Sequence, residues 1–193
     1  MNLTGYYSNY DYKLASGTEN DPDAFIWKSR IISNSVKPDF TFYLTPKNQI
    51  TFGGQYIHYH SKPAEALAIS NGDKVDISQE PRFADESALY IGNEQKLTNR
   101  LSLQYGLRYS FFRSLGPGTI YDFTEEIEGR RKEPVFPGEE YKKGDVISQY
   151  GNWEPRFAMN IGVTSNASIK ASYNRTVQNL HLLSNTAASS PLD

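Results

Sequence analysis

Cysteine and long hydrophobic runs are both absent from the sequence, which has 193 residues and a formal net charge of −2. Without cysteine there is no cysteine–histidine cluster to hold a metal, and the absence fits an oxidising compartment and many cytosolic proteins equally well. No apolar run reaches the roughly 18 residues that a membrane-spanning helix needs. The near-neutral charge gives no reason to expect nucleic acid as a partner. The first residues lack a basic segment followed by an apolar core, so a secretion signal of an exported protein is expected upstream.

Aromatic residues are abundant, with 14 tyrosines and 10 phenylalanines set among many Ser, Thr, Asn and Gly residues. This composition predicts an all-β protein. The stretch LSLQYGLRYSF at residues 101–111 alternates apolar and polar residues, so it predicts a strand with one apolar and one polar face. Its length matches the roughly 9–11 residues of a tilted strand that crosses a bilayer. The negative mean hydropathy does not argue against a membrane protein, because barrel strands mix apolar and polar residues.

About seven strands are predicted, joined alternately by long and short connections. The strands are expected at residues 3–13, 25–44, 49–60, 86–97, 101–111, 152–163 and 168–178. Tight turns are expected at residues 45–48, 98–100 and 164–167, and long irregular connections at residues 16–23, 61–83 and 115–148. This alternation is typical of outer-membrane barrels, whose short turns lie in the periplasm and whose long loops lie outside.

The predicted fold is therefore all-β, with the antiparallel up-and-down strands of a transmembrane β-barrel. With about seven strands, the first and the last would run parallel, whereas single-chain bacterial barrels close with an even number of antiparallel strands. Open sheet edges are not tolerated in lipid. The chain is therefore expected to supply about seven strands of a larger barrel.

The first predicted strand is rich in tyrosine. Leu3 and Gly5 alternate with a face that carries Tyr6, Tyr10 and Tyr12. Together with Tyr7, these make four tyrosines that are expected to form an interfacial belt, in which the ring lies at the membrane boundary and the hydroxyl in water.

Several stretches resemble a known family. Residues 88–112, ALYIGNEQKLTNRLSLQYGLRYSFF, and residues 152–185, NWEPRFAMNIGVTSNASIKASYNRTVQNLHLLSN, are similar to the middle of the barrel of Bacteroidetes TonB-dependent receptors. The most specific elements are GLRYS, the group Glu154-Pro155-Arg156 and the ending KASYNRTVQNLHLLSN, and the hairpin DFTFYLTPKNQITFGGQY is compatible with the same region. The resemblance spans residues 24–193, and the outer loops carry little of it.

The resemblance implies a 22-stranded barrel in the cell outer membrane, closed by an N-terminal plug domain. Such a receptor imports a scarce nutrient (siderophore, vitamin, glycan or peptide) with energy from the TonB complex. The implied partners are outer-membrane lipid, the plug of the parent protein, TonB through that plug, and a small nutrient ligand. The plug, the TonB box and the remaining strands are expected outside this chain. No enzymatic activity, cofactor or metal is expected.

Polar residues that alternate with the outward apolar ones are expected to face the lumen. One interpretation of this polar set is a hydrogen-bonded wall that supports the plug, and the other is direct ligand contact; Glu154 and Arg156 share a face and are expected to pair. Ligand capture outside is expected from the loop residues Tyr121, Phe123, Tyr141 and His181, although each also fits ordinary loop packing. The candidates for the substrate path or plug contact are Gln104, Arg108, Glu154, Arg156, Asn160, Lys170, Asn174 and Gln178.

Two groups of residues have the chemistry of metal ligands. Glu19, Asp21 and Asp23 lack the full spacing of a calcium loop, so a solvated acidic loop is expected there. His58 and His60 share a strand face without a third ligand, so they are expected to be interfacial polar residues. No Ser/His/Asp set and no Gly-rich phosphate loop is readable.

Three other functions remain open from the sequence. A soluble β-sandwich that binds carbohydrate or protein would pack the apolar strand faces against a second sheet. A small-barrel outer-membrane enzyme would need a catalytic set that the sequence does not show. A passive porin would share the barrel wall and lack the plug.

Overall fold

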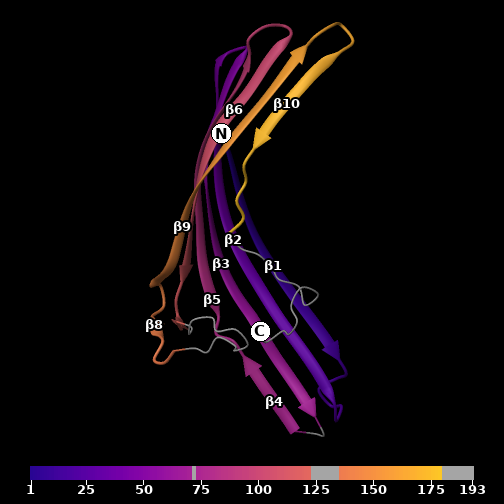
Figure 1. Cartoon of the computed structure of the whole chain (residues 1–193), viewed down its shortest axis with the longest axis vertical. Coiled ribbons are helices and arrows are strands. Elements are labelled where there is room, and N and C mark those ends of the chain that lie inside the picture. The colour runs from indigo at the N-terminus through magenta and orange to yellow at the C-terminus, as the bar shows by residue number, and fades with distance from the viewer. Residues whose placement is uncertain (71–72, 123–134, 180–193) are drawn as a thin grey trace, which may run out of the picture.

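The computed structural model describes residues 1–70, 73–122 and 135–179, in which the regular secondary structure is β-strand (Figure 1). No helix in this part of the chain has the length and hydrophobicity needed to cross a membrane. The strands are β1 (Asn2–Ser16), β2 (Ala24–Thr45), β3 (Asn48–Ser70), β4 (Asp73–Ser78), β5 (Arg82–Lys96), β6 (Leu101–Leu115), β7 (Gly118–Ile120), β8 (Glu139–Tyr141), β9 (Val146–Gly162) and β10 (Ser168–Asn174).

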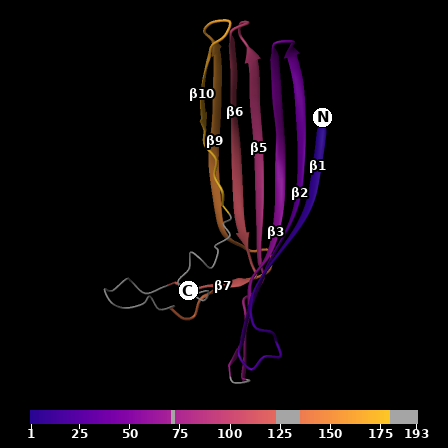
Figure 2. The ribbon, with the colours of Figure 1, turned by 90° about the vertical axis from the view of Figure 1, so that its right-hand side faces the viewer.

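Eight of these strands form one antiparallel sheet that follows the order of the chain. The order is β1-β2-β3-β5-β6-β9-β10, and β4 pairs with β3 off this path. Figure 2 shows the seven strands of the main path side by side. The short strands β7 and β8 pair with each other. The predicted all-β, antiparallel up-and-down fold is confirmed, and the β-sandwich is wrong because the described strands do not stack into two layers.

The strand register keeps apolar and polar side chains on separate faces of the sheet. Between β6 and β9, Leu107 pairs with Pro155, and Arg108 pairs with Glu154. Leu107 is 40% exposed and Phe157 is 42% exposed, so the apolar side chains do not enter a core shared with a second sheet. We call the face that carries Leu107 the apolar face and the face that carries Arg108 the polar face.

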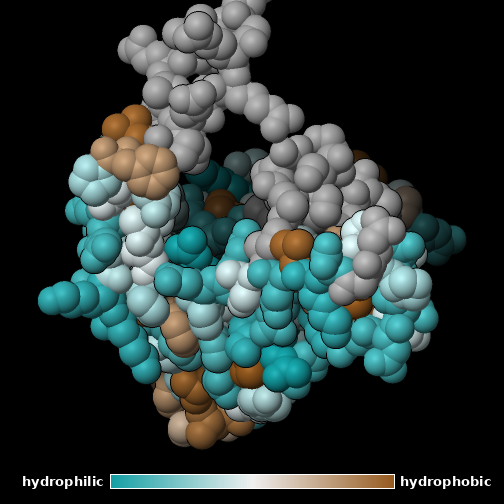
Figure 3. All heavy atoms as spheres, turned by 90° about the horizontal axis from the view of Figure 1, so that it is seen from below, coloured by the Kyte–Doolittle hydropathy of each residue, from teal (hydrophilic) through white to brown (hydrophobic). Residues whose placement is uncertain are grey.

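The polar face is the concave one, because its side chains reach across intervening strands. Arg108 of β6 donates a hydrogen bond of 3.1 Å to Gln55 of β3, across β5. Tyr90 of β5 donates a hydrogen bond to Asp39 of β2, across β3. Long side chains converge in this way where a sheet curls across its strands toward them. Figure 1 shows that the strands are also bowed along their length, and Figure 3 shows hydrophilic residues over most of the face seen from below. A curled sheet with a polar concave face has the shape of part of a barrel wall.

The three tight turns lie where the sequence predicts them and share one local device. Each begins with a threonine whose hydroxyl accepts a hydrogen bond from the backbone N–H two residues later, which fixes the turn without a long loop. The bonds are Lys47 N to Thr45 Oγ1 at 3.3 Å, Arg100 N to Thr98 Oγ1 at 3.1 Å and Asn166 N to Thr164 Oγ1 at 3.3 Å.

At the opposite end, the predicted irregular connection over residues 61–83 is wrong. β3 continues to Ser70, and β4 pairs back onto it. The register with β2 moves from Arg30–Lys62 to Lys28–Glu65, so β3 carries one extra residue at this point. Such a bulge exchanges the two faces of the strand, and it accommodates Pro63, which has no N–H to donate.

Two further predicted boundaries differ from the structure. β9 begins at Val146, inside the predicted connection over residues 115–148, and the hairpin of β7 and β8 lies in the same connection. β10 ends at Asn174, four residues before the predicted end of the strand at Gln178. The strand alternation therefore cannot assign a face to Gln178.

The predicted tyrosine belt in β1 is also wrong for three of its members. Asn2 pairs with Asp39 of the polar face. Tyr6, Tyr10 and Tyr12 lie an even number of residues from Asn2 in the same strand, so they share the polar face. An interfacial belt requires side chains on the apolar face, which these tyrosines do not occupy.

Hydrophobic packing is concentrated beyond the bulge. Trp27 and Ala66 are buried next to each other, and Phe25 packs against them. These residues lie in the parts of β2 and β3 that extend past the paired region of β5 (Figure 1). The cluster therefore stiffens an extension of the sheet at the end away from the tight turns.

Candidate functional site

A row of polar side chains crosses the middle of the concave face. Asp39 of β2, Gly53 of β3, Tyr90 of β5, Arg108 of β6 and Glu154 of β9 are register partners in turn. They share one face and one height in five neighbouring strands. We call these residues the central row.

Arg108 is the member of the central row with three polar partners. Its guanidinium donates to Gln55 at 3.1 Å and lies 3.7 Å from Glu86 and 3.8 Å from Glu154. Glu154 is only 2% exposed, so it needs a nearby cation. Arg156 lies 3.9 Å from the second oxygen of Glu154, which confirms the predicted pairing of Glu154 with Arg156, but the side chain of Arg156 is 54% exposed.

A glycine lets the other half of the row form. The Tyr90 hydroxyl donates to Asp39 by passing over Gly53, where an added Cβ would lie 2.5 Å from the Tyr90 hydroxyl oxygen. Lys37 lies 3.5 Å from Asp39 and 5.6 Å from the centre of the Tyr90 ring. A side chain at position 53 would therefore separate Tyr90 from its carboxylate partner.

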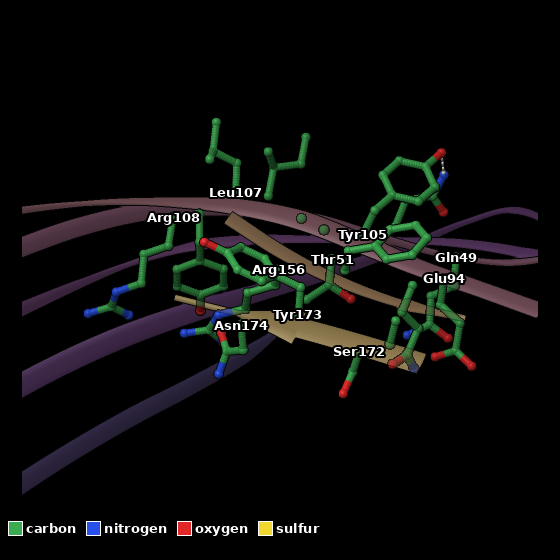
Figure 4. Close-up of a pocket in the computed structure, with 18 of the residues that line it drawn as sticks. Gln49, Thr51, Glu94, Tyr105, Leu107, Arg108, Arg156, Ser172, Tyr173 and Asn174 are labelled. Atoms are coloured by element: carbon green, nitrogen blue, oxygen red, sulfur yellow. Dashed lines mark hydrogen bonds between the residues drawn. The ribbon is translucent and has the colours of Figure 1, made fainter. Parts of the chain in front are cut away.

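A groove of about 530 Å³ lies next to the central row (Figure 4). Its floor lacks side chains where Gly92 of β5 faces Gly106 of β6. In Figure 4, Arg108 points to the opposite side of β6 from Leu107. Four of the eight lumen-facing candidates line this groove: Gln104, Arg108, Arg156 and Asn174.

The remaining candidates lie elsewhere. Glu154 is the register partner of Arg108 in the central row, where it forms an ion pair with Arg108. Asn160 and Lys170 are register partners near a tight turn, away from the groove. Gln178 follows the end of β10, so strand alternation does not assign it to either face and its predicted place in the lumen stays a prediction.

Only two of the four loop candidates fall within the described residues. Tyr121 packs edge-on against Phe136, with ring centres 5.1 Å apart. Tyr141 is half-buried in β8, and a hydrogen bond with Glu139 raises the pKa of its phenol. Phe123 and His181 lie outside the described residues.

Sequence reasoning missed a charged cluster around Asp85, on the apolar face toward the end away from the tight turns. Its carboxylate accepts from the Tyr56 hydroxyl at 2.9 Å, lies 2.8 Å from His58 Nδ1 and accepts from Arg113 at 3.0 Å. Burial acts to raise the pKa of Asp85, but the hydrogen bonds and the charge of Arg113 outweigh it and lower the pKa below its usual value. The available signal was the position of Asp85, which lies an even number of residues from Leu89 in β5 and therefore on the same, apolar, face.

Acid is expected to weaken this cluster. Because the pKa of Asp85 is lower in the folded state, its stabilisation is fully present above the unfolded pKa of about 4 and is lost as the pH falls through the folded pKa. Asp85→Asn should therefore be less stable than the parent at neutral pH and lose less stability on acidification. Denaturant unfolding of the full receptor in lipid vesicles at neutral and acidic pH measures both changes, and equal acid losses would contradict this.

The proposed metal ligands have other partners. His58 bonds to Asp85, and the His60 ring stacks on Phe83 with centres 4.7 Å apart. In the loop after β1, Asp21 accepts a hydrogen bond of 2.7 Å from Thr18 N. Within the residues that the structure describes, no three His, Cys, Asp or Glu side chains gather as a metal site.

Comparison with known protein families gives a match over almost the whole chain. The family model described as "TonB dependent receptor-like, beta-barrel" matches residues 1–190. Neither a curated protein nor a solved structure matches the chain.

Proposed function

Since the chain belongs to the family of TonB-dependent receptor β-barrels, we propose that it forms one side of an outer-membrane importer whose polar face lines the path of a scarce nutrient. The family is one of transporters rather than enzymes. The observation that carries the proposal is a single curled sheet with an exposed apolar outside and an ion-paired concave inside. In a barrel, these faces meet lipid and the aqueous lumen respectively.

The membrane position follows from the apolar face. On β6, apolar side chains occupy alternate positions from Leu101 to Phe111, and Arg113 begins the charged cluster at Asp85. We assign the segment from Leu101 to Phe111 to the hydrocarbon, the tight turns to the periplasm and the Asp85 cluster to the outer boundary. The extension around Trp27 then stands outside the membrane.

The edges of the sheet point to further strands. All residues of β1 and β10 are exposed, and the outer edge of each has no strand partner among the described residues. Unpaired backbone groups are costly in hydrocarbon, so we infer that other strands of the receptor continue the sheet on both sides. The total of 22 strands, the Bacteroidetes type and the separate plug domain stay predictions.

The groove beside the central row is the proposed contact with the plug or the nutrient. Gln104, Arg156 and Asn174 are exposed there and offer amide and guanidinium groups to the lumen. Arg108 forms ion pairs with both Glu154 and Glu86, so these side chains shape the wall rather than reach into the lumen. Asn160, Lys170 and Gln178, with the loop residues Tyr121, Phe123, Tyr141 and His181, stay predictions for substrate passage or capture.

Cysteine labelling tests these assignments, because the chain has no cysteine of its own. In cells that make the full receptor without other cysteines, a water-soluble maleimide should label Gln104→Cys on the polar face. The matched variant Leu107→Cys, on the apolar face of the same strand, should stay unlabelled because lipid covers it. Equal labelling of the two would contradict the facing.

Deleting the plug domain extends the same test. If the plug covers the groove, its removal should raise the labelling rate of Gln104→Cys several-fold. The rate of a cysteine at Asn166, in a tight turn, should change little. An unchanged rate at position 104 would show that the groove does not contact the plug.

A further inference from the structure

Several hydroxyl-bearing side chains lie on the polar face beyond the central row, on the side away from the tight turns. The clearest case is one row of register partners that crosses six strands. We call it the hydroxyl row; its members, from β1 to β9, are Ser8, Ser33, Tyr59, Ala84, Ser114 and Ser148. Five of these six side chains carry a hydroxyl, and none is charged.

Tyrosines flank the hydroxyl row on the same face. Tyr6 and Tyr10 lie on either side of Ser8, and Tyr150 lies two residues beyond Ser148. Their exposures are 45% for Tyr6, 49% for Tyr10 and 58% for Tyr150. Each therefore offers a ring surface and a hydroxyl to the lumen.

The hydroxyl row is neutral although the sheet around it is not. At the same height on the opposite face, His58, Asp85 and Arg113 form the charged cluster. Two steps further out on that face, Arg30 pairs with Asp11. At the height of the hydroxyl row, the lumen side is therefore neutral where the opposite face is charged.

Two charged side chains, Glu86 and Arg82, lie in the rows next to the hydroxyl row. Glu86 faces Arg108 at 3.7 Å. The guanidinium of Arg82 lies beside Gly118, where an added Cβ would come within 2.6 Å of its Nη1. Burial, with the nearby Glu86 and Tyr6, raises the pKa of Tyr59 to about 12, so this phenol remains a neutral donor at physiological pH.

We propose that the hydroxyl row and its flanking tyrosines bind a neutral, polyhydroxylated ligand, that is, an uncharged oligosaccharide, on its way into the lumen. This inference rests on the proposed importer and names its substrate class. Serine and tyrosine hydroxyls both donate and accept hydrogen bonds, as sugar hydroxyls require. Tyrosine rings cover the apolar faces of sugar rings. An anionic iron chelate or a charged peptide would find no counter-charge within the hydroxyl row itself.

An oligosaccharide array tests the proposal with the full receptor in detergent. The array carries neutral and acidic oligosaccharides, and a ferric tricarboxylate complex is measured separately by calorimetry. We expect binding to one or more neutral oligosaccharides and no comparable binding of the charged probes. Absence of binding to every neutral oligosaccharide, or preference for a charged probe, would overturn the proposal.

Variants of β1 make the test specific. Tyr6→Ala with Tyr10→Ala should weaken binding of the neutral oligosaccharide roughly tenfold, because two ring contacts are removed. Tyr7→Ala, on the opposite face of the same strand, should bind like the parent. Tyr10→Phe removes only a hydroxyl and should weaken binding by a smaller factor. Equal affinity of the double variant and the parent would overturn the assignment to this wall.

The two experiments distinguish a wrong substrate class from a wrong proposed function. The cysteine labelling at positions 104 and 107 reports the barrel wall and the plug contact without any ligand. If labelling follows expectation and the array does not, the importer stands and the substrate class is wrong. If labelling fails, the assignment of the polar face to an aqueous lumen is wrong.

Discussion

Leu107→Arg is expected to lower the unfolding free energy of the receptor in a bilayer by about 2–4 kcal/mol, the cost of a cation at the membrane midplane of a barrel. Leu107 lies in the middle of the segment assigned to hydrocarbon and is 40% exposed on the apolar face. Its register partners are Ile91 and Pro155, neither of which can accept a hydrogen bond from a guanidinium through its side chain. Denaturant unfolding of the full receptor in lipid vesicles measures the loss.

The matched control is Gln104→Arg on the same strand. Gln104 is exposed on the polar face and lines the groove. An arginine there faces water and has Glu94 as its register partner, so its effect should stay within about 0.5 kcal/mol, as for ordinary surface changes. Similar losses for the two variants would show that the apolar face does not meet lipid.

The strand faces were predictable because side-chain alternation is local. The pattern around Leu107 and the pattern around Phe157 each separate apolar from polar residues. Pairing the two strands in the observed register brings like faces together, since a shift of one residue would invert one of them. The tight turns were predictable for the same local reason, through Thr, Pro and Asn at their starts.

The outer end of the sheet was less predictable. The bulge at Pro63 exchanges the faces of β3, so the alternation that holds up to His60 does not continue. Proline and glycine in residues 61–83 then favour a loop when only composition is considered. Pairing with β2 and β4 supplies hydrogen bonds that override this local preference.

The tyrosines of β1 show a different limit of sequence reasoning. Alternation shows that Tyr6 and Tyr10 share a face, but it does not show which face meets lipid. That choice depends on the pairing of Asn2 with Asp39, a contact across the hairpin. Once the register is known, the same tyrosines belong to the polar face of the sheet.

The central row depends on contacts that no single strand encodes. Arg108 and Gln55 are 53 residues apart, and Tyr90 and Asp39 are 51 residues apart, with a whole strand between the members of each pair. The sequence identifies Arg108 as polar and inward. Curvature of the sheet decides which distant carboxylates and amides it meets.

Arg108→Leu is therefore expected to lower the unfolding free energy of the receptor by about 2–3 kcal/mol. The substitution leaves Glu154, which is 2% exposed, with Arg156 as its remaining cation at 3.9 Å, and it leaves Glu86 without its ion-pair partner. Removing one member of a buried charge pair costs about 3–5 kcal/mol, and water in the lumen reduces this figure. Unfolding in vesicles at neutral pH measures the change.

Arg156→Leu tests whether an exposed arginine near Glu154 stabilises the sheet as much as the less exposed Arg108 does. Arg156 contacts the same Glu154, but its side chain is 54% exposed, whereas that of Arg108 is 17% exposed. Exposed ion pairs contribute about 0–1 kcal/mol, so this loss should be at most half of the loss in Arg108→Leu. Glu154→Gln should reduce the cost of Arg108→Leu in the double variant, because the buried charge is then removed together with its partner. Additive losses in the double variant would mean that Arg108 stabilises the wall by packing and not by neutralising Glu154.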